Sequence, residues 1–294
     1  MNLLPILLIC GTVILFYFLL SLSVALLLAK YPRDPVDEKP DWGVFEEYRI
    51  LTRNNKKMEC WVVYPDKMRN IEDITKLKEN PAIILLHGWG RNRGRMISRA
   101  RVYGRNGYTT ILFSVRDHGD SEKELLGMSI LRFSQDLEAV LKWWGKPAIL
   151  LGHSIGAGAS LLVASRNQGL VNFVIAESTP YAFPYSLKYV YRPALRRFTT
   201  FFIPGITFFT LLKFRKFTRK YYSPLDASSD IICPVLLIHG KKDQIFPYKY
   251  AKRLQNAIGN HCKVWISEEM DHSNIENHPD YEKNVMKFLK HTTD

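Results

Sequence analysis

The chain of 294 residues has few cysteines and lacks the spacing that binds a structural metal or forms a redox pair. There are four: Cys10 lies in an apolar run, and Cys60, Cys233 and Cys262 lie in or beside expected strands. Buried free thiols are the ordinary state of such residues. Without a C-x-x-C sequence, the pattern argues against a zinc site, a redox site and a disulfide framework, and it agrees with a reducing compartment.

Charged side chains are absent from the first 29 residues, and residues 3–29 form one apolar run. About 20 apolar residues are enough to cross a membrane. The run has neither the basic start nor the small-x-small cleavage site of a signal peptide, which is the main alternative. It also has no polar face, which a helix of a soluble core would turn to water. We therefore expect a single transmembrane anchor over residues 1–29.

Basic residues follow this run and do not precede it. Lys30 and Arg33 come directly after the apolar segment. Basic residues flanking a membrane span usually remain on the cytoplasmic side. The sequence therefore predicts a single-pass membrane protein whose carboxyl-terminal part lies in the cytoplasm.

A nucleic-acid recognition motif, an internal repeat and a low-complexity tract are all lacking. Because the first 29 residues carry no charged side chain, the formal net charge of +13 belongs entirely to residues 30–294. Such a charge can simply favour solubility, but a basic domain tethered beside an anionic leaflet gains about 1 kcal/mol per well-placed Lys or Arg. We expect the membrane, and not a nucleic acid, to be the partner of these charges.

The remaining residues are interpreted as a linker at 30–43 and one domain over 44–294. An antiparallel strand pair is expected first, followed by alternating strands and helices. This alternation predicts an α/β class with a mostly parallel sheet flanked by helices. The expected strands are 44–51, 58–64, 82–86, 109–115, 148–151, 171–176, 234–238 and 263–266. The expected helices are 93–106, 129–144 with Ser129 as N-cap, 154–165, 247–258 and 279–290.

One segment, about 180–222, interrupts the alternation with mixed aromatic and basic side chains. It could be an ordinary helical excursion packed on the core. It could also be a helical cap insertion that covers the site and rests on the membrane, since segments mixing Phe with Lys and Arg bind well at headgroups. The residues concerned are Tyr189, Tyr191, Arg192, Arg196, Arg197, Phe198, Phe201, Phe202, Phe208, Phe209, Lys213, Phe214, Arg215, Lys216 and Phe217.

The most informative motif is Gly152-His153-Ser154-Ile155-Gly156, a G-x-S-x-G sequence. An apolar strand precedes it and a run of small residues follows, which predicts a strand, a sharp turn and the start of a helix. The glycines relieve crowding at such a turn, so that the serine hydroxyl is presented at the edge of the sheet. Ser154 is therefore the candidate nucleophile.

A serine nucleophile needs a histidine base that is held by a carboxylate. On a parallel sheet these partners should follow the serine in the order acid then histidine, each just after the end of a strand. Asp243 and His272 fulfil this requirement. Glu177, at the end of an earlier strand, is the rival acid.

Other acidic and histidine side chains near these positions are poorer candidates. Asp271 adjoins the histidine, and neighbours in an extended loop rarely face one another. His261 and His278 lie outside the loop where the base belongs, and we expect them to be surface residues.

The reaction also needs backbone N–H groups that stabilise an oxyanion, each contributing about 2.7–4 kcal/mol. Ile155 follows the nucleophile at the start of a helix, whose dipole favours negative charge. Trp89 lies in His87-Gly88-Trp89-Gly90, where glycines let the backbone approach a ligand. We expect Trp89 and Ile155 to supply the two donors and His87 to be a structural hydrogen-bonding residue.

Taken together, these motifs resemble the α/β-hydrolase superfamily over residues 44–290. The matching elements are H-G-W-G at 87–90, G-H-S-I-G at 152–156 and H-G-x-x-D-x-x-x-P at 239–247. Residues 116–121 resemble the D-x-R-G-H-G-x-S element of monoacylglycerol-lipase-like and serine-aminopeptidase-like members. They depart from it at Ser114 and Asp117, and we expect Asp117 and Asp120 to brace the loop.

The resemblance implies acyl transfer to water without a cofactor or metal. The leading hypothesis is a membrane-anchored serine esterase that cleaves carboxylic esters or thioesters of acyl chains or lipids. The alternatives are a peptidase or amidase, and a non-catalytic membrane-associated binding module that kept the fold.

Overall fold

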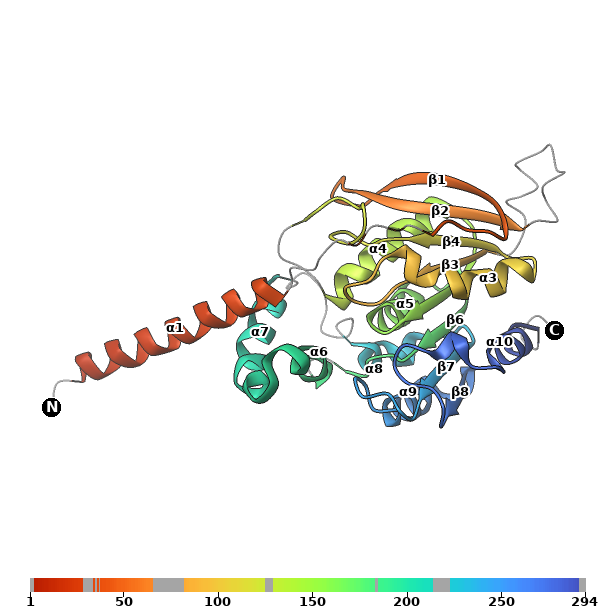
Figure 1. The fold of residues 1–294 in the computed structure, drawn as a ribbon. Helices are drawn as coiled ribbons and strands as arrows, with labels where there is room; N and C mark the ends of the chain where they lie inside the picture. The colour runs from red at the N-terminus through yellow and green to blue at the C-terminus, as the bar shows by residue number, and fades with distance from the viewer. Residues whose placement is uncertain are drawn as a thin grey trace.

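The computed structural model describes residues 3–28, 34, 36, 38–65, 82–124, 129–182, 185–213 and 223–290. Figure 1 shows one long helix, α1 (Leu4–Leu28), which projects away from a domain built of a sheet and its flanking helices. The predicted α/β architecture, mostly parallel and flanked by helices, is confirmed.

The described residues form one sheet of eight strands in the order β1-β2-β4-β3-β5-β6-β7-β8. The first two strands pair antiparallel, β2 pairs antiparallel with β4, and the other neighbours are parallel. The order changes direction around β3, so the loops after β3 and β5 leave the sheet side by side. Ligands of open α/β sheets bind at such a point. The strands are β1 (Gly43–Leu51), β2 (Lys57–Pro65), β3 (Ala82–Leu86), β4 (Thr109–Phe113), β5 (Ala148–His153), β6 (Val171–Glu177), β7 (Val235–Gly240) and β8 (Cys262–Ser267).

Both faces of the sheet are covered, as the continuous apolar runs of the central strands predict. In β3, Ile84 belongs to the apolar cluster of α4, α5 and α9, whereas its neighbour Leu85 belongs to the cluster of α3 and α10. Successive side chains therefore enter opposite layers of the core. The helices are α3 (Ile97–Arg105), α4 (Ile130–Trp144), α5 (Ile155–Arg166), α8 (Pro224–Ala227), α9 (Lys249–Ile258) and α10 (Tyr281–Lys290).

Several element ends differ from the predicted ones. The helix predicted over 93–106 starts as a 3-10 turn, η2 (Arg93–Met96), where Asn92 accepts a hydrogen bond from the Gly94 N–H. The helices predicted from residues 247 and 279 begin two residues later. Ser129 does cap α4, since its hydroxyl accepts from the Arg132 N–H.

The end of the predicted linker packs on the domain. Trp42 is 2% exposed, and Glu38 and Asp41 both pair with Arg101. The limits 1–29, 30–43 and 44–294 remain a prediction from composition. Lys30 and Arg33, which carry the predicted orientation, lie outside the described residues.

Between β6 and β7 the chain forms helices, as both interpretations of this segment expected. It consists of α6 (Tyr185–Leu195), the turn η3 (Arg196–Phe198) and α7 (Thr199–Lys213). The aromatic and basic residues at 214–217 lie outside the described residues. In Figure 1, α6 joins the domain to α7, and α7 lies against α1.

Length and composition make α1 a candidate membrane span over Leu4–Leu27. Only 6% of its apolar window is buried. A helix of the domain core would be mostly buried, so that interpretation does not fit α1.

Candidate active site

Ser154 occupies the sharp turn between β5 and α5. Its backbone has φ 56° and ψ −122°, a conformation that L-residues rarely adopt. The glycines two positions away make the turn possible. A Cβ at Gly152 would lie 2.3 Å from the Gly156 carbonyl oxygen, and a Cβ at Gly156 would lie 2.5 Å from the His87 carbonyl oxygen. The G-x-S-x-G spacing is thus required by the space around the turn.

The structure brings the three predicted residues together. Ser154 Oγ lies 3.0 Å from Nε2 of His272, and Nδ1 of His272 lies 2.8 Å from Oδ2 of Asp243. Because an ionised carboxylate only accepts hydrogen bonds, the imidazole proton resides on Nδ1. The lone pair on Nε2 then faces the serine hydroxyl, which is the arrangement in which histidine can take up its proton.

Four N–H groups point at the carboxylate of Asp243. The backbone N–H groups of Ile245 and Phe246 donate to Oδ1, each at 2.8 Å. The imidazole of His272 donates to Oδ2 at 2.8 Å. Nε2 of His239 lies 3.1 Å from the same oxygen and also donates to the Phe246 carbonyl at 2.9 Å. Burial raises the pKa of Asp243, but the hydrogen bonds from the two histidines outweigh it and hold that pKa well below its usual range. The carboxylate therefore stays ionised and can stabilise an imidazolium beside it.

His153, directly before the serine, holds the loop that carries His272. Its Nε2 donates to the backbone carbonyl of His272 at 2.7 Å. Burial, followed by the charges of Arg99 and His272, lowers the pKa of His153 well below the usual histidine value, so the ring is neutral. This role was not predicted for His153. Nothing local in the sequence indicates a contact with a residue 119 positions away.

The loop after β3 is held by two histidines. His87 donates from Nδ1 to the Gly88 carbonyl at 2.7 Å and accepts the Val115 N–H at Nε2 at 3.1 Å. His118 accepts the Gly90 N–H at 3.2 Å. His87 therefore has the structural role that was predicted for it. Burial and the neighbouring His118 lower the pKa of His87 well below the usual value.

Two alternative acids are placed elsewhere by the structure. Glu177 is fully buried and binds Arg99 at 2.6 Å and the Tyr281 hydroxyl at 2.7 Å. Burial raises the pKa of Glu177 despite the charge of Arg99. Asp271 accepts the backbone N–H groups of Ser273 and Asn274, at 2.6 and 3.0 Å. Both carboxylates are thus engaged by groups other than the His272 imidazole.

The two histidines expected at the surface do not line the cavity that contains Ser154. His261 is exposed. His278 is partly buried, packs against the ring of Trp265 and accepts the Asp280 N–H.

That cavity has a volume of about 190 Å³ and two chemically different sides. Tyr189 of α6, Ile245 and Phe246 form an apolar side, while Arg91 and Arg95 bring positive charge. The predicted oxyanion donors also line it. The full lining consists of Gly88, Trp89, Arg91, Arg95, His153, Ser154, Ile155, Tyr189, Ile245, Phe246, His272 and Ser273.

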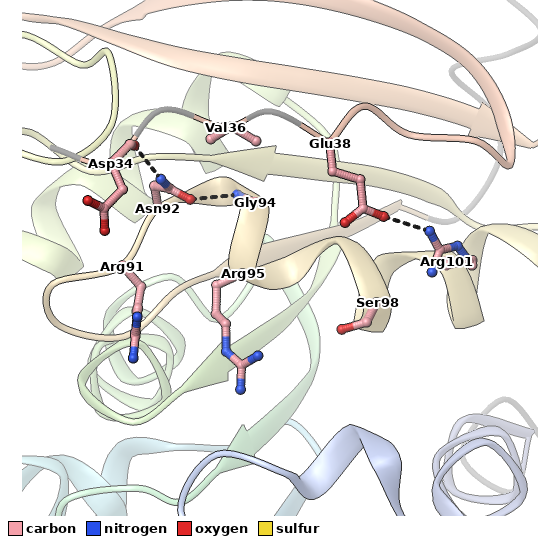
Figure 2. A pocket seen from close by; sticks show the side chains of 9 residues that line it. All are labelled: Asp34, Val36, Glu38, Arg91, Asn92, Gly94, Arg95, Ser98 and Arg101. Atoms are coloured by element: carbon pink, nitrogen blue, oxygen red, sulfur yellow. Dashed lines mark hydrogen bonds and ion pairs between the residues drawn. The ribbon is translucent and has the colours of Figure 1, made fainter.

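Arg91 and Arg95 also line a second cavity, of about 390 Å³, beside the linker. Figure 2 shows their side chains extending in the same direction, away from the ion pair of Glu38 and Arg101. Arg95 donates to the Ser273 carbonyl and lies 3.6 Å from Glu276. Arg91 is exposed, and no hydrogen bond or ion pair to its guanidinium is found within the described part of the chain.

Positions 114 and 117, where the chain departs from the related element, have structural partners. Ser114 donates to Glu59 at 2.6 Å. Asp117 has φ 68°, accepts the Glu124 N–H at 2.7 Å and pairs with Arg132 at 2.7 Å. Asp117 therefore braces this loop, as expected. Asp120 is exposed and contributes its backbone carbonyl to Arg49.

Within the described ranges, no group of three or more His, Cys, Asp or Glu side chains could hold a metal ion. The four cysteines are free, and three of them, Cys60, Cys233 and Cys262, are buried. Burial raises the pKa of the Cys233 thiol to about 11, so it is protonated at neutral pH.

Comparison with known proteins agrees with this geometry. The family model for the alpha/beta hydrolase fold matches residues 81–203. The lysophosphatidylserine lipase ABHD12 of Danio rerio is 25% identical over 192 residues, which are 60% of this chain and 46% of that protein. The chain thus spans less than half the length of this relative.

Two further proteins match this chain over larger shares of both sequences. The uncharacterized membrane protein YNL320W of Saccharomyces cerevisiae is 24% identical over 77% of this chain and 72% of its own length. The esterase Pf2001 of Pyrococcus furiosus superposes with a TM-score of 0.67 at 20% identity, covering 89% of this chain and 96% of the esterase. With the sheet order and the serine turn, these similarities show that the chain has the α/β-hydrolase fold.

Proposed function

We propose that this chain is a membrane-anchored serine hydrolase that cleaves carboxylic esters or thioesters of acyl chains. The observation that carries the proposal is the chain of two contacts from Ser154 through His272 to Asp243, at 3.0 and 2.8 Å. The contacts join a hydroxyl, an imidazole and an ionised carboxylate in the order that activates a serine.

In this mechanism Ser154 Oγ attacks the carbonyl carbon while His272 takes its proton. The carbonyl oxygen becomes an oxyanion, which the backbone N–H groups of Trp89 and Ile155 stabilise. His272 then returns the proton to the leaving alcohol or thiol, and an acyl group remains on Ser154. Water, deprotonated by the same histidine, releases the acid, and no cofactor or metal takes part.

The membrane part of the proposal is supported by α1 and by the similarities. Helix α1 has the length and composition of a membrane span. The yeast relative is described as a membrane protein, and the fish relative as a lipase. Lys30 and Arg33 support a cytoplasmic location for the domain. A tethered site of this kind would act on substrates that partition into the bilayer.

The cavity suggests the substrate class more closely. Its apolar side, at Tyr189, Ile245 and Phe246, suits an acyl chain. Arg91 and Arg95 line the same cavity, and guanidinium groups bind phosphate and carboxylate well. The lipid in the name of the fish relative, lysophosphatidylserine, is an acyl ester with an anionic headgroup. We therefore favour single-acyl lipid esters whose headgroup carries a phosphate or carboxylate.

The test uses the full chain in detergent micelles with a fluorophosphonate probe and p-nitrophenyl esters. We expect covalent labelling and ester turnover, and we expect Ser154→Ala to abolish both. Labelling that persists in Ser154→Ala would refute the assignment. Faster turnover of aminoacyl amides than of esters would favour the amidase alternative, and a folded chain inert to both reagents would favour a binding module.

A further inference from the structure

Helix α7 makes specific contacts with the anchor helix α1. The Tyr17 hydroxyl donates to the Phe201 carbonyl at 2.8 Å and accepts the Gly205 N–H at 3.1 Å. These two groups are four residues apart, so an α-helix normally pairs them with each other. A side chain of α1 thus takes part in the backbone hydrogen bonding of α7, next to Pro204, which lacks an N–H of its own.

The contact is also closely packed. A Cβ at Gly205 would lie 2.3 Å from Ser21 Oγ, and Ser21 is fully buried beneath this glycine. Phe18 packs against Phe208, with ring centroids 4.8 Å apart. Small residues at a helix crossing let two backbones approach closely, as in membrane helix pairs. Figure 1 shows α7 against the carboxyl-terminal half of α1.

The position of the contact along α1 indicates its depth in a membrane. Ser21 lies seven residues before the end of α1, about 10 Å at 1.5 Å per residue. The 25 residues of α1 span about 37 Å, about 7 Å more than the hydrocarbon core. Ser21 therefore lies about 3 to 10 Å inside the hydrocarbon boundary, depending on which end of α1 extends beyond it, and Tyr17 lies about 6 Å deeper.

The surface of α7 suits that depth. Phe201, Phe208 and Leu212 are 55%, 48% and 50% exposed. Their spacing of seven and four residues puts them on the face of α7 that also carries Gly205. Phe201 and Phe208 therefore flank the crossing, contact the rings of Tyr17 and Phe18, and still keep about half of their surface exposed. Arg196 and Arg197, at the start of the same segment, are basic and lie outside the core. Apolar side chains on one face with cations beside them are typical of helices that lie at the headgroup boundary.

We infer that α7 lies in the plane of the membrane, with Phe201, Phe208 and Leu212 among the lipid acyl chains, and that it is fixed there by its contact with α1. The inference rests on the proposed membrane anchoring. It extends the proposed function, because α6 connects this helix to the active site. Tyr189 of α6 lines the cavity, and Tyr191 packs on Trp89 with centroids 6.1 Å apart. One wall of the cavity is therefore tied to the bilayer surface, where acyl-chain substrates reside.

The first experiment measures depth. The full chain is placed in vesicles of phosphatidylcholine and phosphatidylglycerol, with Phe208→Cys on a Cys10→Ser background labelled with bimane. Ile232→Cys is the matched control, because Ile232 is an apolar residue of similar exposure, 54%, outside α1 and α7. We expect lipids with a nitroxide near the glycerol end of the chain to quench the label at 208 and not the label at 232.

Two results would overturn the inference. One is equal or absent quenching at both positions in chains that float with the vesicles. The other is a disulfide between two chains through position 208, which would mean that a second copy covers this face. Quenching does not depend on hydrolysis, so this measurement stands even if the proposed enzyme activity fails.

The second experiment tests the link to the active site with Tyr17→Phe, which removes both hydrogen bonds and keeps the ring. Ser23→Ala is the control, since Ser23 bonds within its own helix, to the Leu19 carbonyl. We expect Tyr17→Phe to reduce quenching at 208. We also expect it to slow hydrolysis of a vesicle-dissolved ester about tenfold, equivalent to about 1.4 kcal/mol, with p-nitrophenyl acetate hydrolysis unchanged. An equal effect on both esters, or none on either, would refute the link.

Discussion

Replacing Asp243 with asparagine should reverse the tautomer of His272. The backbone N–H groups of Ile245 and Phe246 both donate to Oδ1 at 2.8 Å, so the single amide oxygen of the new side chain must occupy that position. Its NH₂ group then faces Nδ1 of His272, which donates to Asp243 in the native chain, and Nε2 of His239, which lies 3.1 Å from the same oxygen. Donors would meet donors, and His272 can relieve this by moving its proton to Nε2. An imidazole protonated at Nε2 cannot accept the proton of Ser154.

The expected loss can be estimated from this change. The same substitution in a serine-histidine-aspartate triad with intact geometry lowers kcat about 10⁴-fold. At 1.36 kcal/mol per factor of ten, that is about 5 kcal/mol of transition-state stabilisation. The assay is kcat for p-nitrophenyl butyrate, together with the rate of fluorophosphonate labelling, on the full chain in detergent micelles.

Asp271→Asn is the matched control. Asp271 is adjacent to the same histidine, but its Oδ1 accepts two backbone N–H groups that an amide oxygen can also accept. We expect it to lower kcat by less than about tenfold, the effect of weakening one or two hydrogen bonds. The assignment of Asp243 as the acid would be wrong if Asp243→Asn kept kcat within tenfold of the native chain. It would also be wrong if Asp271→Asn lowered kcat by as large a factor as Asp243→Asn.

Contacts around the serine support three other predictions. Gly152→Ala should prevent correct folding of the turn and abolish fluorophosphonate labelling, because the new Cβ would lie 2.3 Å from a backbone oxygen. A variant that is labelled and fully active would contradict this. Arg91→Gln should raise KM for an anionic lysophospholipid more than KM for a neutral monoacylglycerol. Arg105 lies outside the cavity lining, so Arg105→Gln should change neither KM. Equal effects of Arg91→Gln on both lipids would refute a headgroup role for Arg91. His153→Gln should flatten the fall in stability below about pH 6.5, since a neutral buried histidine stabilises the fold above its unfolded pKa and this contribution is lost as pH falls. Pulse proteolysis should show that the free energy of unfolding decreases less steeply as the pH falls, by up to about 1.4 kcal/mol per pH unit. An unchanged slope would mean that His153 binds its proton equally well in the folded and unfolded chains.

Much of the fold could be predicted because its signals are local. The apolar runs of the central strands lie buried in the sheet, and their alternation with helices predicted the parallel pairing. Ser129 could be recognised as a cap from its position alone. Helix starts at residues 247 and 279 were placed two residues early, because the backbone first forms a turn that composition does not reveal.

The three side chains Ser154, Asp243 and His272 could also be proposed from the sequence, because loops after parallel strands meet at one edge of the sheet. The groups that hold them could not. His153 binds the His272 carbonyl across 119 residues, and His239 shares the Asp243 carboxylate from the end of β7. A histidine in a strand has no local feature that tells a positioning residue from an ordinary core residue.

For the helices expected at the membrane, the sequence predicted the elements but not the contact between them. Composition alone predicted a membrane span at α1 and offered a membrane-resting cap after β6 as one of two interpretations, as separate features. Composition could not show that Tyr17 and Gly205 join them, because a single tyrosine in an apolar helix and a single glycine in another are each common. Once joined, α1, α7 and α6 form a continuous path to Tyr189 in the cavity. If α1 spans the bilayer and α7 lies at its surface as inferred, the anchor would do more than retain the domain at a membrane. It would then also set the height and direction from which an acyl chain reaches Ser154.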